Sequence, residues 1–93
     1  MLEIRTNCEN CNLDLPNTSQ KAMICSYECT FCANCVTDVL ENVCPNCGGG
    51  FEKRPIRPSK ELEKNPVRAD KILKPVIRNK FLDKNKTVPP HLR

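Results

Sequence analysis

Residues 25–47 read CSYECTFCANCVTDVLENVCPNC and place six cysteines within twenty-three residues. Two more, Cys8 and Cys11, complete the eight cysteines of the 93-residue chain. By spacing the eight form four close pairs: Cys8/Cys11, Cys25/Cys29, Cys32/Cys35 and Cys44/Cys47. Structural zinc is held by four ligands in a tetrahedron, and zinc-binding sequences supply them as such closely spaced pairs. The sequence therefore predicts two zinc sites that together use every cysteine.

A framework of disulfide bonds is the main alternative, because short secreted chains often carry this many cysteines. The first ten residues, MLEIRTNCEN, lack the apolar run of a signal peptide. No stretch approaches the roughly twenty apolar residues of a membrane span. We therefore expect a cytoplasmic protein without a membrane segment, whose reduced cysteines bind metal.

The apolar content of the chain is small, with three Phe, one Tyr and no Trp. A core of this size does not offset the entropy of ordering the chain unless metal or disulfides add stability. We predict a two-zinc module over residues 1–52, followed over residues 53–93 by a basic tail rich in Pro, Lys and Arg that is partly disordered alone.

Charge differs between the two parts of the chain. Residues 1–51 contain two basic and six acidic residues, whereas residues 52–93 contain thirteen basic and five acidic residues. A basic tail of this kind is typical of proteins that meet a polyanionic or acidic partner. It can also fold back on the acidic head, or serve only to keep the protein in solution.

Within the module the pattern favours a small hairpin followed by one helix. Residues 21–25 (KAMIC) and 30–31 are short strand candidates, which two-stranded pairing alone would hold only marginally. Residues 33–43 predict a helix, because an apolar stripe at i, i+3, i+4 and i+7 follows one face. That stripe consists of Val36, Val39, Leu40 and Val43. Asn12 and Gly48 each follow a C-x2-C pair, where a left-handed backbone is expected.

The spacing leaves two ways to join the pairs. In the sequential arrangement the first two pairs bind one zinc and the last two bind the other. In the interleaved arrangement site 1 consists of Cys8, Cys11, Cys32 and Cys35, and site 2 consists of Cys25, Cys29, Cys44 and Cys47. Interleaving would prevent either half of the module from opening alone.

The order C-x2-C-x13-C-x3-C-x2-C-x2-C-x8-C-x2-C over residues 8–47 resembles the ligand order of a RING finger in an all-cysteine version. This resemblance implies the interleaved arrangement and a small α+β fold of the RING-like, cross-braced type. RING ubiquitin ligases usually have an apolar residue before the second ligand, whereas this chain has Asn10.

Over roughly residues 1–58 the chain is also similar to a family of small bacterial cysteine-rich proteins of unknown function. The segments MLEIRTNCENCNLDLP, ICSYECTFCANCV and CPNCGGGFEKRPIRP carry that similarity. It implies a zinc module in a bacterial setting and assigns no activity.

Catalytic zinc keeps an open position and usually includes His or a carboxylate, but the sole histidine, His91, lies far from every cysteine in the sequence. We therefore expect a non-enzymatic adaptor that binds a protein partner through structural zinc. A nucleic-acid-associated protein acting through residues 53–93 is the alternative. A thiol redox or metal-responsive protein, with Cys32 and Cys35 as the reactive pair, is a third possibility. Iron is a possible substitute for zinc in vitro, because thiolate tetrahedra also accept it.

Overall fold

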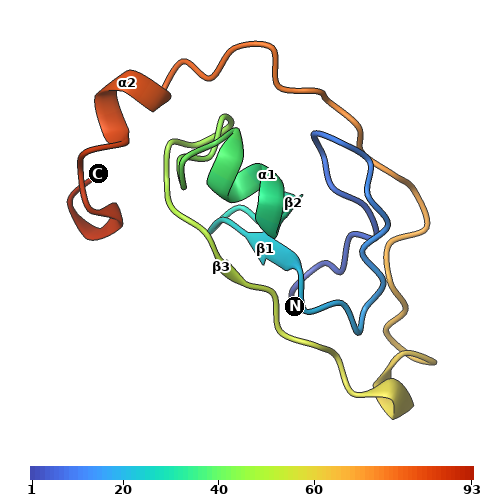
Figure 1. Cartoon of the computed structure of the whole chain (residues 1–93). Coiled ribbons are helices and arrows are strands. Elements are labelled where there is room, and N and C mark those ends of the chain that lie inside the picture. The colour runs from blue at the N-terminus through green and yellow to red at the C-terminus, as the bar shows by residue number, and fades with distance from the viewer.

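The computed structural model describes residues 1–93 and gives a small α+β fold built around a three-stranded sheet (Figure 1). The elements in chain order are β1 (Ala22–Ile24), β2 (Thr30–Cys32), α1 (Ala33–Asp38), β3 (Glu52–Lys53), the 3-10 turn η1 (Ser59–Glu61), α2 (Leu82–Asn85) and the 3-10 turn η2 (Pro90–Leu92). No helix is long and apolar enough to cross a membrane.

The sheet has β1 in the centre and both neighbours antiparallel to it, in the order β2-β1-β3. Met23 lies opposite Phe31 of β2 on one side and opposite Lys53 of β3 on the other. The predicted hairpin is thus confirmed, with a third strand added from beyond the last cysteine pair. Three strands with one covered face are stable where an isolated hairpin is marginal.

The core lies between the sheet, α1 and the cysteine pairs. Phe31 and Phe51 meet edge to face, with ring centroids 5.4 Å apart and planes at 78°. Leu15 and Leu40 are fully buried beside them. Cysteines make up half of the twelve-residue core cluster, so the sulfur clusters occupy the positions that aliphatic side chains fill in larger domains.

Helix α1 begins where the sequence predicts but ends at Asp38, five residues before the predicted end at residue 43. Glu41 and Asn42 have positive φ angles of 47° and 60°, which an α-helix does not contain. Leu40 and Val43 are nevertheless fully buried, because the turn after the helix carries them to the core. Val39, the remaining outer member of the predicted stripe, is 43 % exposed.

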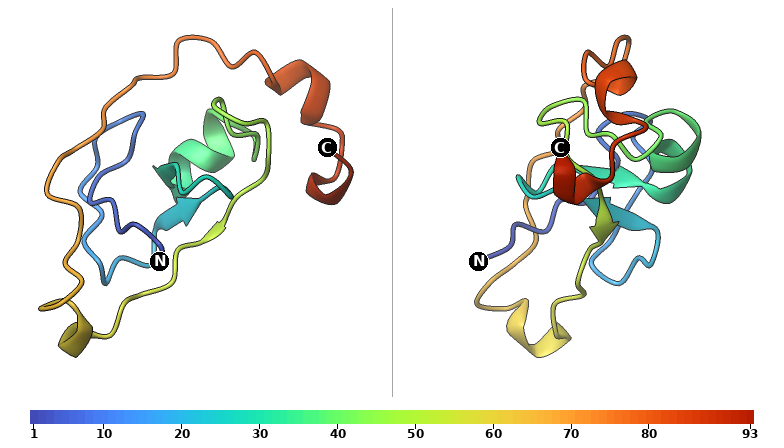
Figure 2. Two further views of the ribbon diagram at one scale, coloured as in Figure 1. Left: turned by 180° about the vertical axis from the view of Figure 1, so that it is seen from behind. Right: turned by 90° about the vertical axis from the view of Figure 1, so that its left-hand side faces the viewer.

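The segment after β3 extends to η1 and then returns along the N-terminal residues and past the cysteine-containing loops to α2 (Figures 1 and 2). Arg68 N donates to the carbonyl of Ile4 at 2.8 Å on this return path. Of the possibilities raised by the charge pattern, the structure therefore has the tail folded back on the head. The boundary after residue 52 and the partial disorder of residues 53–93 in isolation stay predictions.

The segment after β3 is attached to residues 1–51 by four of its arginines. Arg54 is 3 % exposed and its guanidinium donates to the carbonyls of Arg5, Leu15 and Pro16. Arg57 donates to the carbonyls of Leu2 and Asn65. Arg68 pairs with the carboxylate of Glu3, and Arg93 donates to the carbonyl of Asn42.

Candidate metal centre

Two cysteine clusters occupy the two ends of the region between the N-terminal loop and α1. In cluster one the sulfur atoms of Cys8, Cys11, Cys32 and Cys35 all lie within 4.8 Å of one another. The first pair comes from the N-terminal loop, and the second pair comes from the end of β2 and the first turn of α1. Cys11 is exposed and the other three are buried.

The dimensions of cluster one fit a tetrahedral thiolate site. Cys11 Sγ and Cys32 Sγ are 3.7 Å apart. A tetrahedron with metal–sulfur distances of about 2.3 Å has edges of about 3.8 Å. A disulfide requires sulfurs about 2.05 Å apart, and all eight cysteines are free thiols in this structure. The donor set and its spacing therefore suit zinc.

Cluster two lies at the other end of the β1–β2 hairpin, where Cys25 and Cys29 flank the turn between the strands. The sulfurs of Cys25, Cys44 and Cys47 lie within 4.8 Å of one another. Cys29 is not within that distance of all three, yet its thiol interacts with the sulfurs of Cys25 and Cys44. Its placement next to the trio makes it the available fourth ligand.

The clusters pair the cysteines in the interleaved order. Cluster one joins the first pair to the third, and cluster two joins the second pair to the fourth. Each cluster therefore joins two segments of the chain, and a cysteine pair of the other cluster lies between those segments in the sequence. The cysteines are thus grouped in the interleaved order that the resemblance implied and not in the sequential order, and their roles as ligands of two zinc ions stay predictions.

Nitrogen donors surround the sulfurs, as expected around thiolates that share negative charge with a metal. In cluster two the backbone N–H groups of Tyr27, Asn46 and Gly49 donate to Cys25, Cys44 and Cys47, each at 3.4 Å. The N–H of Cys35 donates to Cys32 Sγ at 3.5 Å in cluster one. These are the tight turns that the C-x2-C and C-x3-C spacings make.

The predicted left-handed residues support the same turns. Asn12 has φ 65° and Gly48 has φ 79°, so both expectations are confirmed. Asn12 N donates to the carbonyl of Cys8, and Gly48 N donates to the carbonyl of Cys44. A non-left-handed residue after either pair would carry the chain away from the turn that orients the sulfurs.

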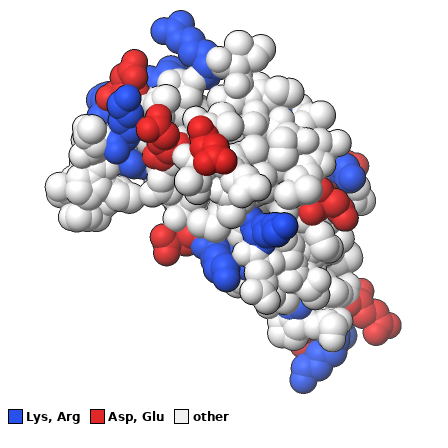
Figure 3. Space-filling view, viewed as in Figure 1, with Lys and Arg blue, Asp and Glu red and all other residues white.

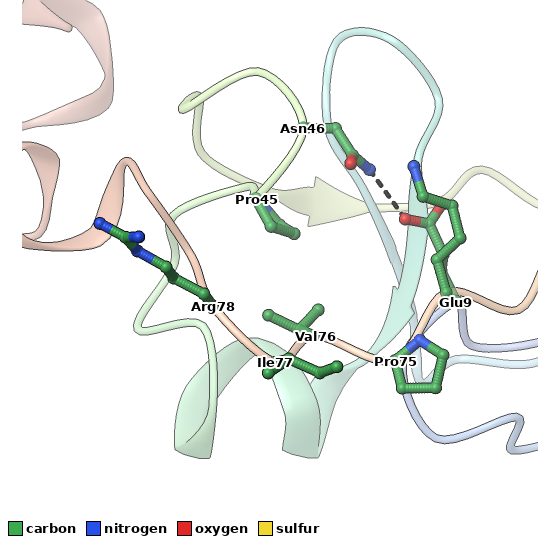
Figure 4. A pocket seen from close by; sticks show the side chains of 8 residues that line it. Glu9, Pro45, Asn46, Pro75, Val76, Ile77 and Arg78 are labelled. Carbon is green, nitrogen blue, oxygen red and sulfur yellow. Dashed lines mark hydrogen bonds between the residues drawn. The ribbon is translucent and has the colours of Figure 1, made fainter.

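Side-chain amides add donors that the sequence analysis did not identify. Asn10 Nδ2 donates to Cys35 Sγ at 3.3 Å. Asn46 Nδ2 lies 2.8 Å from Glu9 Oε2 and 3.4 Å from Cys29 Sγ, and so joins the first loop to cluster two (Figure 4). The signal was available in principle, because both asparagines occupy the x positions of C-x2-C pairs.

Arg5 supplies positive charge close to cluster two. Its Nη1 lies 3.9 Å from Glu9 Oε1, and its guanidinium lowers the pKa of Cys29, after the larger effects of hydrogen bonds from Cys25 and Cys44. Together these bring the pKa of Cys29 to about 2. The same pairing raises the pKa of Cys25 to about 11. Of the pair Cys25 and Cys29, Cys29 is thus the thiolate when no ion is bound.

Burial and mutual contact keep other thiols protonated. Desolvation raises the pKa of Cys35, and contacts with the sulfurs of Cys25 and Cys29 raise the pKa of Cys44. A divalent cation would replace these protons, because the thiolate is the form that ligates metal. The two clusters are therefore chemically suited to hold metal ions, and His91 takes no part because it lies in η2 at the far end of the chain.

Comparison with known proteins supports the family indicated by the sequence. A family described as a protein of unknown function (DUF1272) matches residues 1–57, which include all eight cysteines. The chain is also 52 % identical over 75 residues to the uncharacterized protein R02474 of Rhizobium meliloti (strain 1021), covering 81 % of this chain and 89 % of that protein. No solved structure matches the chain. The chain therefore belongs to the DUF1272 family, whose members' function is unknown.

Proposed function

We propose that the protein is a non-enzymatic adaptor whose protein-binding surface is shaped by two structural zinc ions. Site 1 takes Cys8, Cys11, Cys32 and Cys35 as ligands, and site 2 takes Cys25, Cys29, Cys44 and Cys47. The observation that carries the proposal is the interleaving of two all-cysteine clusters around a core of which they form half. Metal in such positions supplies folding free energy directly.

The donor set favours a structural over a catalytic role. Catalytic zinc sites leave one position to water or substrate, whereas four sulfurs are available to each ion here. Glu9, the buried carboxylate nearest the clusters, is engaged by Asn46 and Arg5. Zinc is the preferred metal because it binds thiolate tetrahedra without redox chemistry, and iron would be an in vitro substitute.

Tyr27 marks the surface that we expect to bind a partner. It lies between Cys25 and Cys29 and is 71 % exposed, while its backbone N–H donates to Cys25 Sγ. Tyrosine is enriched in protein interfaces because it offers a large rigid apolar area with a polar end. Site 2 would hold this side chain outward on a fixed turn.

The first test measures the zinc content of the purified protein. We expect two zinc ions and eight reduced thiols per chain. A chain without metal, or a chain with four disulfides, would overturn the proposal. Immobilised full-length protein is then used to retain partner proteins, with Tyr27→Ala beside Ser26→Ala, whose side chain is exposed on the same turn. We expect Ser26→Ala to retain the same partner as the wild type and Tyr27→Ala to lose it. Equal retention by the wild type, Tyr27→Ala and the metal-site variant Cys32→Ser would show that no zinc-shaped surface is involved.

A nucleic-acid-associated role remains the second candidate, and one observation favours it. Every lysine of residues 53–93 and Arg78 are exposed, which leaves nine cations free of the module. On the face shown in Figure 3, however, Lys and Arg are interspersed with Asp and Glu. If the protein has this role, its affinity for duplex DNA should fall steeply as the salt concentration rises. A salt-independent affinity, or none at low salt, would exclude this role.

A further inference from the structure

We propose that residues 72–85 form a metal-dependent clasp, so that the protein reports the loss of either metal ion by releasing its basic C-terminal segment. This metal-responsive function goes beyond the adaptor role. It uses the two metal sites of the proposed function but does not depend on any partner protein.

The hydrogen bonds of the clasp all end beside the cysteine clusters. Five such bonds join residues 72–85 to residues 1–51. Their partners on the module are Asn7, Glu9, Asn10, Val43 and Gly48. Each of these five is the immediate sequence neighbour of a clustered cysteine. Attachment of the clasp therefore depends on the loop shapes that the metal ions would fix.

At cluster one the clasp lies extended along the first loop. Asn7 Nδ2 donates to the carbonyl of Ile72 at 2.8 Å, and Lys74 N donates to the carbonyl of Glu9 at 2.8 Å. Val76 N donates to Asn10 Oδ1 at 2.7 Å. Alternate residues thus face the loop, as in a strand added to a sheet edge.

Asn10 connects the clasp directly to a sulfur. Its Oδ1 accepts from Val76 N, while its Nδ2 donates to Cys35 Sγ. The position of this sulfur therefore sets the position of the amide that binds Val76. A metal ion held by Cys35 would fix both, and its loss would leave the amide without a fixed anchor.

At cluster two the clasp holds both sides of the last cysteine pair. Asn79 Nδ2 donates to the carbonyl of Val43 at 2.8 Å, and Asn85 Nδ2 donates to the carbonyl of Gly48 at 3.0 Å. The ring of Phe81 packs so closely over Gly48 that a Cβ there would lie 2.9 Å from Phe81 Cδ1. The C-terminal end of the clasp therefore requires the turn of Cys44–Cys47.

Residues 66–78 have little structure of their own. No backbone hydrogen bond joins one of them to another. Val76 packs on the core cluster, whereas Ile77 beside it is 97 % exposed. A small cavity of about 260 Å³ lies between this segment and the loops, lined by Glu9, Pro45 and Asn46 on the module side (Figure 4). Beyond Arg68, which binds Ile4 and Glu3, the segment is held in place by the loops.

Coupling of this kind works in both directions, because the free energy that links two binding events is shared by both. If the metal sites hold the clasp, the clasp must also raise the affinity of the module for metal. Chelation alone does not test this, since removing zinc would also unfold the module. The test therefore opens the clasp and follows the metal.

Zinc-loaded full-length protein is mixed with a chromogenic chelator, and amide hydrogen exchange of Lys74 is measured on the same sample. Val76→Lys places a charge against the core, and Ile77→Lys adds the same charge at the exposed neighbour. We expect Val76→Lys to expose the Lys74 amide and to lower the zinc affinity, measured from the share of zinc transferred to the chelator at equilibrium, roughly tenfold, the lower end of the effect of groups around a metal site. Ile77→Lys should match the wild type in both.

The Ala33 amide, which donates to the carbonyl of Lys21, checks that the module stays folded. Should Val76→Lys unfold the module, Val76→Ala replaces it and keeps the N–H. At the other end, Asn85→Ala should increase the share of zinc transferred to the chelator at equilibrium, with Lys84→Ala as its control. An exposed Lys74 amide with unchanged zinc transfer would overturn the proposal, as would a Lys74 amide that stays protected in both Val76 variants.

Discussion

Replacing Arg54 with alanine should strongly destabilise the module. The Arg54 side chain is buried at 3 % exposure without a carboxylate partner, and burial lowers its pKa. Its charge is compensated only by the carbonyls of Arg5, Leu15 and Pro16. Arg5 lies before the first cysteine pair, and Leu15 and Pro16 lie after it. The Arg54 side chain therefore holds both ends of the loop that carries this pair next to the end of β3.

The expected magnitude follows from the three acceptors. A carbonyl that loses its donor inside a protein costs about 1–3 kcal/mol. The lower figure applies here, because water can reach the partly buried bonds to Arg5 and Pro16 once the side chain is removed. Three acceptors at about 1 kcal/mol each give a loss of about 3 kcal/mol. That is a large share of the roughly 5 kcal/mol at the low end of the stability range of natural proteins.

Urea unfolding with excess zinc, followed by far-ultraviolet circular dichroism, measures this loss. With a slope of about 1 kcal/mol per molar urea, 3 kcal/mol lowers the midpoint by about 3 M. Lys53→Ala is the matched control, because Lys53 is the exposed neighbour in β3. A midpoint for Arg54→Ala within about 0.5 M of the Lys53→Ala midpoint would refute the reasoning that Arg54 fastens the loop.

Three further outcomes are expected. Zinc binding at pH 7 should release protons, because the raised pKa of Cys25, about 11, keeps that thiol protonated until metal binds. The apparent affinity for zinc should therefore fall as the pH falls. Calorimetry in buffers of different ionisation enthalpy counts the released protons, and zero release would contradict this prediction. Cys32→Ser should reduce the zinc content of the chain and unfold the module, and a folded variant with two zinc ions would remove Cys32 from the ligands. Gly48→Ala should destabilise the protein by at least about 1 kcal/mol, because φ of Gly48 is +79° and the new Cβ would lie 2.8 Å from Asn85 Nδ2. Gly49→Ala is the control, because its Cβ would meet nothing closer than 3.5 Å. Equal urea midpoints for the two variants would argue against a fixed turn at Gly48.

The cysteine clusters were accessible from the sequence because close pairs constrain geometry locally. A C-x2-C pair can bring two sulfurs to one point only by turning, and the turn asks for a left-handed residue after it. Asn12 and Gly48 satisfy that requirement in the structure. Spacing alone could not decide which pairs meet, and the ligand-order resemblance supplied that choice.

The end of α1 shows a different limit of sequence reasoning. The stripe of Val36, Val39, Leu40 and Val43 fits one helical face, but a tight turn can bury two of these residues equally well. Glu41 and Asn42 take left-handed backbone conformations, at a cost that the burial of Leu40 and Val43 offsets. The periodicity of apolar residues indicates which residues are buried, but it does not determine the backbone path between them.

Strand β3 and the clasp were missed for a related reason. A two-residue strand has no measurable alternation, and it exists here because β1 offers an unpaired edge. The asparagines that hold the clasp find partners 36 to 66 residues away in the sequence. Each reads locally as turn chemistry, so only the folded chain reveals that it joins two distant segments.

The positive charge of the tail illustrates how one composition supports two opposite roles. Four of its five arginines bind carbonyls or a carboxylate of the chain, whereas all eight of its lysines are exposed. The planar guanidinium can satisfy several acceptors at once, which suits it to attachment, while the strongly hydrated ammonium group stays in water. The arginines therefore fix the segment to the module, and the lysines stay exposed. In a variant that opens the clasp while the module stays folded, Arg54 and Arg57 would keep the segment attached near residues 54–57, and only the lysines beyond them would gain freedom.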